Sequence, residues 1–598
     1  MILQRLVEYY DRLAGDPQWA DSLAKPGYSV QKISFCVVLE TDGTLQQFQS
    51  LLDSNQKKQL PRQMLVPGQS KPPGSGINPC FLWDNAAYLL GFKPDDPKPA
   101  RTRESFEAFR DRHLNLEQEV ASPAFNAVCS FLRNWSPEKA IEYATVLKDT
   151  VSSFGVFRIA GAHAFVHDDP AVVTFWGDHD VADPAAPRGL CLVTGQEGPI
   201  ARLHEPKIKG VRGAQSAGAL LVSFNDEAYK SFGKDQSYNA PVSTAATFKY
   251  TNALNQLLGR NDRRLSLGDA TVVLWAEHRT PLEEYASEIF ADAPPPPDDA
   301  PVEDKRRAEQ VQLFLSQVRE GHAGDEAIKP EDATRFYVLG LSPNAARVSI
   351  RFWADSTVGE MKARLAQHMS DTALAGSREG DPPLMIRRIV LATGRAEKDN
   401  KGRLKSYDAD SVPPMLAGAV ARAVLVGGPY PQTLLTAMIN RLRADGIISH
   451  ARVATIKACI VRNSRLQGQP KEVPVALDTN RTDPPYVIGR LFALLEKIQS
   501  DSAGGDLNTT IKDRYFSAAS ATPGIVFPRL IRLSQHHMAK MDTRQKVYYE
   551  KLLGEAMNKL DGFDRHLNLE DQGLFAVGYF HQRQDLFTSK KNKEGEAE

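Results

Sequence analysis

The chain lacks paired cysteines, long apolar runs and a net charge. Its five cysteines show no C-x2-C spacing, which excludes a zinc ribbon and a disulfide framework and predicts free thiols in a reducing compartment. No stretch reaches about 18 uninterrupted apolar residues, so no membrane span is expected. The N-terminal segment MILQRLVEYYDRLAGD places charges within its apolar runs and predicts no signal peptide. The expected location is therefore cytoplasmic.

The absence of net charge does not by itself exclude any class of binding partner. The 598 residues hold 73 Lys+Arg and 73 Asp+Glu, and are 42% hydrophobic and 24% charged. This composition is that of a globular protein and excludes collagen-like and largely disordered chains. A total of zero offers a polyanion no general attraction, but a local cluster of cations can still bind one.

An acidic, proline-rich segment predicts the main division of the chain. Residues 281–304 contain eight Asp and Glu, no Lys or Arg, and the run Pro294 to Pro297. Such a composition buries no core and favours an extended linker. A second polar segment, 395–414, precedes an Ala-rich region. The predicted segments are 1–290, an acidic Pro-rich linker at 291–304, 305–414 and 415–598.

The apolar residues follow mixed periods first and a helical period later. Residues 33–39 alternate as in a strand, and short apolar runs at 156–159, 190–193, 219–224 and 271–275 predict further strands. After Met415 the apolar residues recur every three or four positions, as on one face of a helix. The expected fold class is α+β, with a mixed α/β N-terminal region followed by a C-terminal all-α helical bundle.

Motifs for catalysis are scarce. The chain has no G-x4-G-K-[ST] phosphate loop and no G-x-S-x-G nucleophile turn. Adjacent His and Asp side chains can both reach a divalent ion, so the pairs His167-Asp168 and His179-Asp180 leave a metal-dependent nuclease open, although ordinary loop residues are the simpler interpretation. We predict no metal and no cofactor, and these motifs leave an enzyme open without pointing to one.

Positive charge gathers in one loop of the N-terminal half. Residues 201–216, ARLHEPKIKGVRGAQS, contain four cations and one acid, with glycines at 210 and 213 that let the backbone approach a ligand. Arg, Lys, Gln and Ser donate hydrogen bonds to phosphate oxygens and base edges. The pattern is typical of a nucleic-acid contact, and a solvated basic turn is the alternative.

A second loop carries small hydrogen-bond donors on an apolar base. The segment GQSKPPGSGINPCFLWDN combines Lys71, Ser75 and Asn78 with the apolar triplet FLW at 81–83. A rigid loop of this kind can read a groove of DNA. An ordinary surface turn explains the pattern equally well.

The C-terminal region is basic. From Met415 onward there are 25 Lys+Arg and 19 Asp+Glu, and within 512–559 nine cations face four acids. A basic helical face can follow a nucleic-acid strand, with Tyr515, Phe516, Tyr548 and Tyr549 available for stacking. The alternative is a solvated helix face above core aromatics.

Several long strings resemble the large subunit of the subtype I-C CRISPR interference complex (Cascade). They are MILQRLVEYYDRL, GYSVQKISFCVVL, SGINPCFLWDNAAYLLG, RTRESFEAF, CLVTG, PIARLHEPKIKGVRGAQSAGALLVSFN, SFGKDQSYNAPVS and FYVLGLSPNAARVSIRFW, in order from residue 1 to about 355. The helical C-terminal part agrees with the family in character.

The resemblance implies a DNA-binding subunit and not an enzyme. In this family the large subunit lies at the 5′ end of a guide RNA carried by backbone subunits. It reads a short protospacer-adjacent motif in double-stranded DNA, opens the duplex, and supports recruitment of a helicase-nuclease. In this scheme the protein reads the few base pairs of the motif, and base pairing with the guide RNA reads the remaining target sequence. Segment 1–290 would be the motif-reading and DNA-contacting domain, and 415–598 would resemble the small subunit.

The resemblance also leads to three groups of candidate DNA contacts. Motif reading is expected of Lys71, Ser75, Asn78, Gln31 and Lys32. A second DNA-contacting loop is expected to use Lys207, Lys209, Arg212, Gln215, Ser216, Lys234 and Asn239. Basic helices that track a strand are expected to use Arg529, Arg532, Lys540, Arg544, Lys546 and Lys551. Lys and Arg suit phosphate, and Asn, Gln and Ser suit base edges.

The resemblance further implies that the small subunit is made from the same gene by internal translation. No methionine lies between Met438 and Met538, so such a product would need a non-AUG start, for example at Val473, Val475 or Val487. Besides the nuclease, a purely structural scaffold subunit that binds only protein remains the alternative function.

Overall fold

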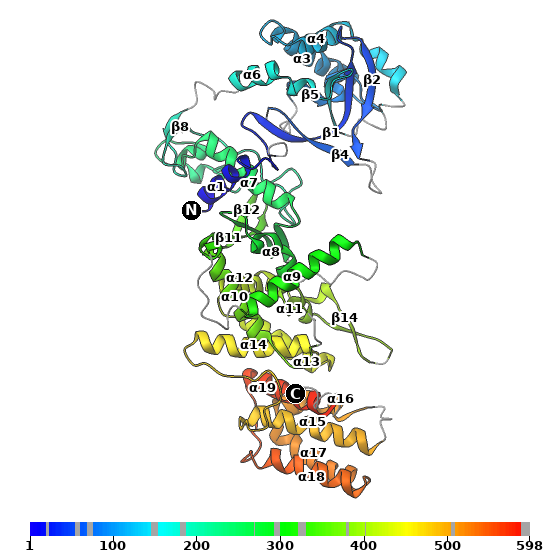
Figure 1. Cartoon of the computed structure of the whole chain (residues 1–598), viewed down its shortest axis with the longest axis vertical. Helices are drawn as coiled ribbons and strands as arrows, with labels where there is room; N and C mark the ends of the chain where they lie inside the picture. Colours follow the sequence, from blue (N-terminus) through cyan, green and yellow to red (C-terminus); the bar gives the residue numbers. More distant parts are fainter. Residues whose placement is uncertain are drawn as a thin grey trace. The chain divides into compact units, whose positions relative to one another are not determined.

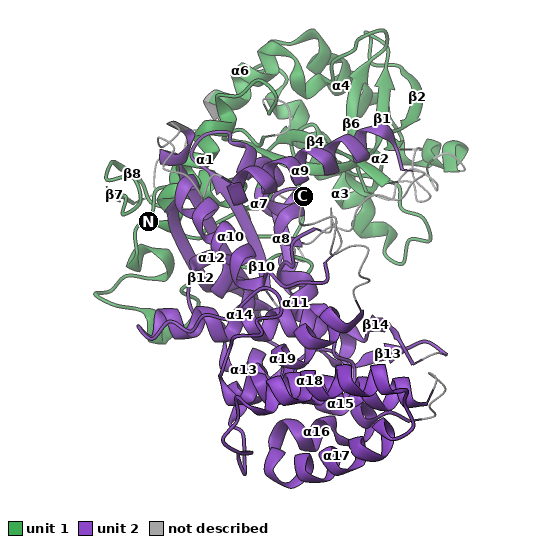
Figure 2. Cartoon of the chain, turned by 60° about the horizontal axis from the view of Figure 1, so that its bottom comes forward, with its two compact units in different colours: residues 1–209, 216–256 green, residues 210–215, 257–598 purple. Residues whose placement is uncertain are grey.

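The chain folds into two compact units. The computed structural model describes residues 1–587 except 20–22, 54–59, 69–75, 145–146, 148–152, 180–186, 268–269, 292–299, 321–329, 378–381, 401 and 504–508. The first unit comprises Met1–Lys209 and Ser216–Gln256, and the second comprises Gly210–Gln215 and Leu257–Glu598 (Figure 2). None of the helices in the described ranges combines the length and the apolar character that crossing a bilayer requires.

The first unit is built on a six-stranded sheet with helices on it. The strands of this sheet are β1 (Tyr28–Leu39), β2 (Leu45–Ser50), β3 (Leu52–Asp53), β4 (Leu60–Pro67), β5 (Trp83–Asn85) and β6 (Phe154–Ile159). Two further strands, β7 (Arg188–Leu190) and β8 (Glu197–Pro199), pair separately with each other. The α-helices of the first unit are α1 (Ile2–Ala14), α2 (Ala86–Leu90), α3 (Pro99–Leu116), α4 (Pro123–Asn134), α6 (Pro170–His179) and α7 (Thr244–Gly259). Short 3-10 turns are η1 (Pro137–Tyr143), η2 (Val166–Asp168), η3 (Glu227–Tyr229) and η4 (Gln236–Asn239).

Strand β1 is the centre of this sheet. The order is β3-β4-β1-β6-β5, with β2 also paired to β1, and β1 runs parallel to β6 but antiparallel to β2 and β4. Phe35, Val37 and Leu39 enter one apolar cluster with α2 to α4, and Cys36 and Val38 enter another on the opposite face. Both faces are therefore buried, which explains the nearly continuous apolar sequence of this strand.

The second unit joins a four-stranded sheet to a helical region. Its strands are β9 (Arg264–Leu267), β10 (Ala270–Ala276), β11 (Arg335–Asn344), β12 (Arg347–Thr357), β13 (Ala396–Lys398) and β14 (Leu404–Tyr407). Helices α8 (Pro281–Ala291), α9 (Val302–Glu320), α10 (Val358–Thr372), α11 (Ile386–Ala392) and α12 (Leu416–Val426) lie near the sheet. The remaining helices are α13 (Gln432–Asp445), α14 (His450–Leu466), α15 (Pro484–Ser502), α16 (Ile511–Ala521), α17 (Pro523–Met538), α18 (Thr543–Met557) and α19 (Leu569–Phe587).

The four-stranded sheet has the antiparallel order β12-β11-β10-β9. Helix α10 follows β12 at once because Thr357 and Glu360 form a capping box, each side chain bonded to the backbone N–H of the other. One apolar cluster continues from this sheet through α10 to α14 and into α15 to α19. The sheet and the bundle of the second unit therefore share a single core.

Helices α15 and α19 pack so closely that their contact requires glycine. A Cβ at Gly489 would lie 2.1 Å from the carbonyl oxygen of Phe575, and one at Gly578 would lie 2.1 Å from that of Tyr486. With α16 to α18 these helices form the end of the second unit that is farthest from its sheet (Figure 1).

The predicted α+β class is confirmed, with both sheets before residue 358 and predominantly helices after it. The expected strands at 33–39, 156–159 and 271–275 lie in β1, β6 and β10. Two expected strands are wrong. Only Leu190 of 190–193 belongs to β7, and 219–224 holds no strand, because its pairing is limited to isolated bridges such as Ile208 with Ala219.

The compact units differ from the predicted segments. Strands β9 and β10 precede the expected linker at 291–304 but pair with β11 and β12 beyond it. Segment 1–290 is therefore not one compact unit, because its last strands complete a sheet of the second unit. Residues 281–291 and 302–304 of the acidic stretch belong to helices α8 and α9, and 292–299 lie outside the described residues.

Candidate nucleic-acid interface

The basic loop 201–216 is held on buried apolar side chains. Ile208 is buried, and its backbone exchanges hydrogen bonds of 2.8 and 2.9 Å with Ala219. The side-chain amide of Asn255 on α7 donates to the carbonyl of Lys207 at 3.0 Å and accepts from the N–H of Lys209 at 2.8 Å. The loop backbone is thus fixed on both sides of Ile208, with the two lysines as its neighbours.

The loop also contains a buried histidine. His204 is 1% exposed, and its Nδ1 lies 2.6 Å from the hydroxyl of Tyr250 on α7. Burial lowers the pKa of His204 to about 4. The imidazole is therefore neutral near pH 7, and the positive charge of the loop comes from its Lys and Arg side chains.

The cations of the loop have no acidic partners among the residues that the structure describes. Lys209, Arg212, Gln215 and Ser216 are exposed, and Lys207 is half-buried. Neither the two lysines nor Arg212 forms an ion pair with any residue in the described part of the chain. Unneutralised, exposed cations on a fixed backbone are well suited to contact phosphate.

The two glycines of the loop adopt conformations that other residues rarely do. Gly210 has φ of 91° and Gly213 has φ of 79°. Arg212 lies between them, and its N–H donates to the Thr271 hydroxyl of β10 at 3.0 Å. Residues 210–215 belong to the second unit, whereas the flanking parts of the loop belong to the first.

The segment that follows contains Lys234 and Asn239 in different roles. Lys234 is exposed. Asn239 is half-buried, and its side chain accepts from the N–H of Ser231 and donates to the carbonyls of Lys234 and Gln236, at 2.9 to 3.0 Å. Its amide is thus already engaged in supporting the turn around Lys234, so any contact of Asn239 with DNA stays a prediction.

The first predicted loop is only partly described. Lys71 and Ser75 lie outside the described residues. Asn78 is exposed, and its N–H donates to the hydroxyl of Tyr88 at 3.3 Å. The apolar base is present as expected, because Phe81, Leu82 and Trp83 are all buried.

The two candidates on β1 differ in access. Gln31 is 8% exposed, and its amide donates to the hydroxyl of Ser29 at 2.9 Å. Lys32 is exposed on the adjacent position, opposite Gln63 of β4. Alternation along the strand therefore makes Lys32 the more accessible of the two.

All six cations predicted on the basic helices are exposed. Arg529, Arg532 and Lys540 lie on or just after α17, and Arg544, Lys546 and Lys551 lie on α18. Within the described ranges the only ion pair of the six joins Lys546 to Glu550 at 3.9 Å.

The aromatic residues near these cations divide between core and surface. Phe516 and Tyr549 are buried, Tyr515 is half-buried beneath the guanidinium of Arg529 at 5.7 Å, and Tyr548 is 52% exposed. Of the four, Tyr548 is the ring available for stacking, and Phe516 and Tyr549 serve the core.

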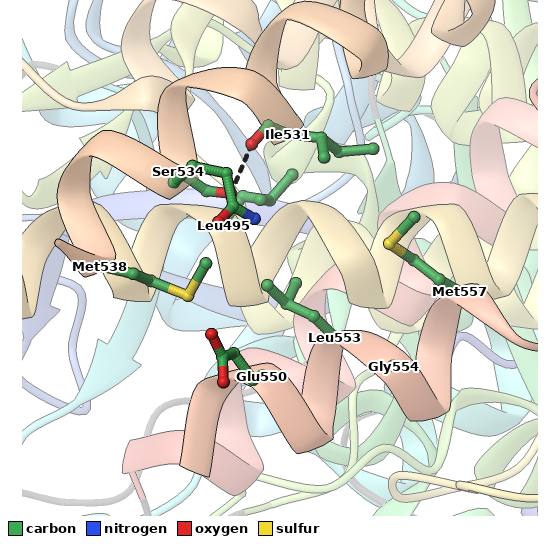
Figure 3. Close-up of a pocket in the computed structure, with 9 residues that line it drawn as sticks. Leu495, Ile531, Ser534, Met538, Glu550, Leu553, Gly554 and Met557 are labelled. Carbon is green, nitrogen blue, oxygen red and sulfur yellow. Dashed lines mark hydrogen bonds between the residues drawn. The ribbon is translucent and has the colours of Figure 1, made fainter. Parts of the chain in front are cut away.

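A small pocket opens between α15, α17 and α18 (Figure 3). Its lining consists of Leu495, Ile531, Ser534, Gln535, Met538, Glu550, Leu553, Gly554 and Met557. The hydroxyl of Ser534 donates to the Ile531 carbonyl of its own helix at 2.7 Å. Glu550 is the single ionisable side chain of this lining, so the pocket has the character of an apolar recess and not of a catalytic cleft.

The described residues of the two His-Asp pairs do not form a metal site. His167 is 1% exposed, its Nε2 lies 3.8 Å from Asp168, and burial lowers its pKa. The side chain of His179 and all of Asp180 lie outside the described residues. Among the residues with a described position, no group of three or more His, Cys, Asp or Glu side chains could hold a metal ion.

Phe232 escaped the sequence prediction, and Arg202 was counted among the cations of the basic loop but not named as a DNA contact. Phe232 is 98% exposed, and Arg202 is exposed and bonded through Nη1 to the side-chain oxygen of Gln236 at 3.0 Å. The available signal for Phe232 was an aromatic residue directly before a glycine in a polar stretch, SFGKDQ.

Comparison with known proteins gives one match over nearly the whole chain. The family model described as CRISPR-associated protein (Cas_Csd1) matches residues 6–587. No curated protein matches this sequence.

Proposed function

Because the chain belongs to the Cas_Csd1 family of CRISPR-associated proteins, we propose that it is the large subunit of a subtype I-C Cascade. In this role it recognises the protospacer-adjacent motif in double-stranded DNA, begins duplex opening and R-loop formation, and supports recruitment of a helicase-nuclease. It acts in the cytoplasm as a binding protein and not as an enzyme.

The observation that carries this proposal is a set of surface cations, of which only Lys546 forms an ion pair with a residue of described position. They occupy loop 201–216 and helices α17 and α18, although the whole chain has no net charge. Nucleic-acid affinity depends on the number of phosphates that such cations neutralise. The proposal therefore assigns Lys207, Lys209 and Arg212 to phosphate contacts near the motif.

Base reading is assigned to the glycine-rich loop. Asn78 is exposed and its side-chain amide forms no hydrogen bond with the described residues, so it can donate to acceptors on a base edge. Lys71 and Ser75, on the same loop in sequence, would assist it. Gln31 and Lys32 are the secondary candidates, and the α17 and α18 cations would follow a separated strand.

The proposed partners follow from the same role. They are the guide RNA with its 5′ end, the Cascade backbone subunits that carry it, double-stranded target DNA, a small subunit made by internal translation, and the helicase-nuclease recruited in trans. The subunit on its own would bind DNA weakly, because motif sampling needs modest nonspecific affinity.

The test is binding of the assembled, guide-loaded complex to duplexes that differ only in the motif. We expect tighter binding to the motif duplex, with equal guide complementarity in both. Equal affinities would remove motif reading and favour a structural scaffold. Divalent-dependent cleavage by the isolated chain, lost in His167→Ala, would instead favour the nuclease.

A further inference from the structure

The turn Ser231–Lys234 presents an aromatic ring to solvent. Phe232 and Gly233 have φ of 51° and 67°, and the N–H of Lys234 donates to the carbonyl of Ser231 at 3.0 Å. The Phe232 side chain is 98% exposed and contacts no other ring in the described part of the chain. An aromatic residue in this left-handed region is uncommon and strained.

Hydrogen bonds and ion pairs hold the turn in place, although Phe232 at its tip is exposed to solvent. The side chain of Asn239 bonds to three backbone groups of the segment 231–236. Lys230 forms ion pairs with Glu227 at 2.6 Å and with Asp235 at 3.1 Å. Behind the turn, the N–H of Ser237 donates to the carbonyl of Arg202 at 3.3 Å, which ties the segment to the start of the basic loop.

The cations near the Phe232 ring differ in whether an acidic side chain neutralises them. Lys230 engages Glu227 and Asp235, and Lys234 has no ion pair with a described residue. Arg202 bonds to the neutral side chain of Gln236, so its charge also remains uncompensated within the described ranges. An exposed ring on a fixed turn, beside two free cations, has the chemistry that binds a base together with its phosphates.

We propose that Phe232 stacks on an unpaired nucleobase while Lys234 and Arg202 contact neighbouring phosphates. The inference rests on the proposed function, because it places nucleic acid at the basic loop. Stacking explains why the turn holds a large apolar ring in solvent at a strained position, since the ring becomes buried only in the complex. The base comes either from the opened DNA beside the motif or from the 5′ end of the guide RNA.

Three variants of the assembled complex distinguish the loss of the Phe232 ring from a change in the conformation of the turn. Phe232→Asn removes the ring and supplies a residue that tolerates positive φ, so the turn should keep its conformation. Phe232→Tyr keeps a stacking ring. Ile141→Ala is the matched control, because Ile141 is an apolar residue, 73% exposed, in the same unit but outside the turn.

The readout is the fluorescence of 2-aminopurine, which stacking quenches, placed either in the DNA next to the motif or in the guide 5′ segment. These two placements are the DNA arm and the guide arm of the experiment. In one of them Phe232→Asn should restore fluorescence, and Phe232→Tyr and Ile141→Ala should not. If the base is in DNA, Phe232→Asn should also weaken duplex binding about 5- to 100-fold, with an unchanged ratio between motif and non-motif duplexes because stacking tolerates any base.

Unchanged fluorescence of Phe232→Asn in both arms would overturn the proposal. Equal effects of Phe232→Asn and Ile141→Ala would also overturn it, since any exposed apolar residue would then suffice. Failure of the proposed function looks different: the unmutated complex would not distinguish motif from non-motif duplexes, whereas the guide arm would still report on stacking at Phe232.

Discussion

Single polar side chains hold the loops of the candidate interface in place. Asn255 and Asn239 each bond to backbone groups on both sides of a loop segment. His113 of α3 instead accepts one hydrogen bond from the N–H of Leu82, in the glycine-rich loop. Each bond satisfies a backbone group that would otherwise be unpaired near the core. Asn78 differs because its side-chain amide forms no hydrogen bond with any residue of described position.

We expect Asn78→Ala to reduce discrimination between motif and non-motif duplexes by about 1–3 kcal/mol, because a base edge loses a hydrogen-bond donor. The measurement is the ratio of the two dissociation constants for the assembled complex. Asn126→Ala, on an exposed position of α4, is the control. An unchanged ratio for Asn78→Ala would assign this residue to loop support.

His113 predicts a pH dependence of stability. It is fully buried, its Nε2 accepts from the N–H of Leu82 at 2.9 Å, and its Nδ1–H donates to the carbonyl of Phe109 at 2.7 Å. Burial is the main cause that lowers its pKa from 6.5 to about 3. As the pH falls, His113 is therefore protonated in the unfolded chain before it is protonated in the folded one. The contribution of this group to the free energy of unfolding is fully present above pH 6.5 and falls as the pH drops towards 3.

The expected slope from this one group is at most about 1.4 kcal/mol per pH unit. His113→Gln should be less stable than the parent at pH 7 but should lose less stability between pH 6.5 and 5. Urea unfolding at a series of pH values measures both effects. The exposed His163→Gln is the control, and parallel curves for parent and His113→Gln would contradict the assignment.

At the scale of elements, residues 201–209 of the basic loop form a preformed surface of charge within the first unit. Its cations stand on a backbone fixed by α7 and by buried Ile208. Little conformational entropy is then lost when the loop binds. The charges can act on any DNA sequence, since phosphates carry no base identity.

The double replacement Lys207→Ala and Lys209→Ala should weaken binding to all duplexes by a similar factor. The slope of log affinity against log salt should fall by about one for each phosphate that is no longer neutralised. Titrations at several salt concentrations measure this slope. Alanines at the exposed Lys93 and Lys139 serve as controls, and an effect on one sequence only would make the loop a base reader.

The α15 to α19 bundle limits where an internally translated product can begin. Tyr486 lies against Gly578, and its hydroxyl is 3.0 Å from Nδ1 of His581 on α19. A start at Val487 would remove Tyr486 and the first turn of α15, whereas starts at Val473 or Val475 keep the helix whole. We therefore expect a product that begins at Val473 or Val475.

Mass spectrometry of the expressed complex identifies such a product by its N-terminal peptide. Replacing the codons of Val473 and Val475 by synonymous ones that cannot initiate should remove it, and the same change at Val487 is the control. Absence of any C-terminal fragment from the unmodified gene would contradict internal translation.

At the scale of the whole molecule, the zero net charge conceals an uneven distribution. Asp371, for example, is buried between Arg462 and Arg465, with its oxygens 2.8 to 3.0 Å from their nitrogens. Arg452 is also fully buried, and it bonds to Asp445, to the carbonyl of the last residue of α11, and to carbonyls that follow α11 and α13. These charges are satisfied within the core, so the cations left for binding are the exposed ones that have no acidic partner among the described residues.

Sequence alone determined the α+β class, the family resemblance and the basic segments, because strand alternation, helical period and charge clusters are local patterns. It did not show that β9 and β10 join a sheet with strands beyond 291–304, and it misplaced the strand at 219–224, since strand pairing joins residues far apart in the chain. Only the tertiary structure decided that Gln31 is buried, that Asn239 is engaged and that Phe232 is bare. The physical reason is that exposure and hydrogen-bond partners depend on what packs against a residue, which its sequence neighbours do not specify.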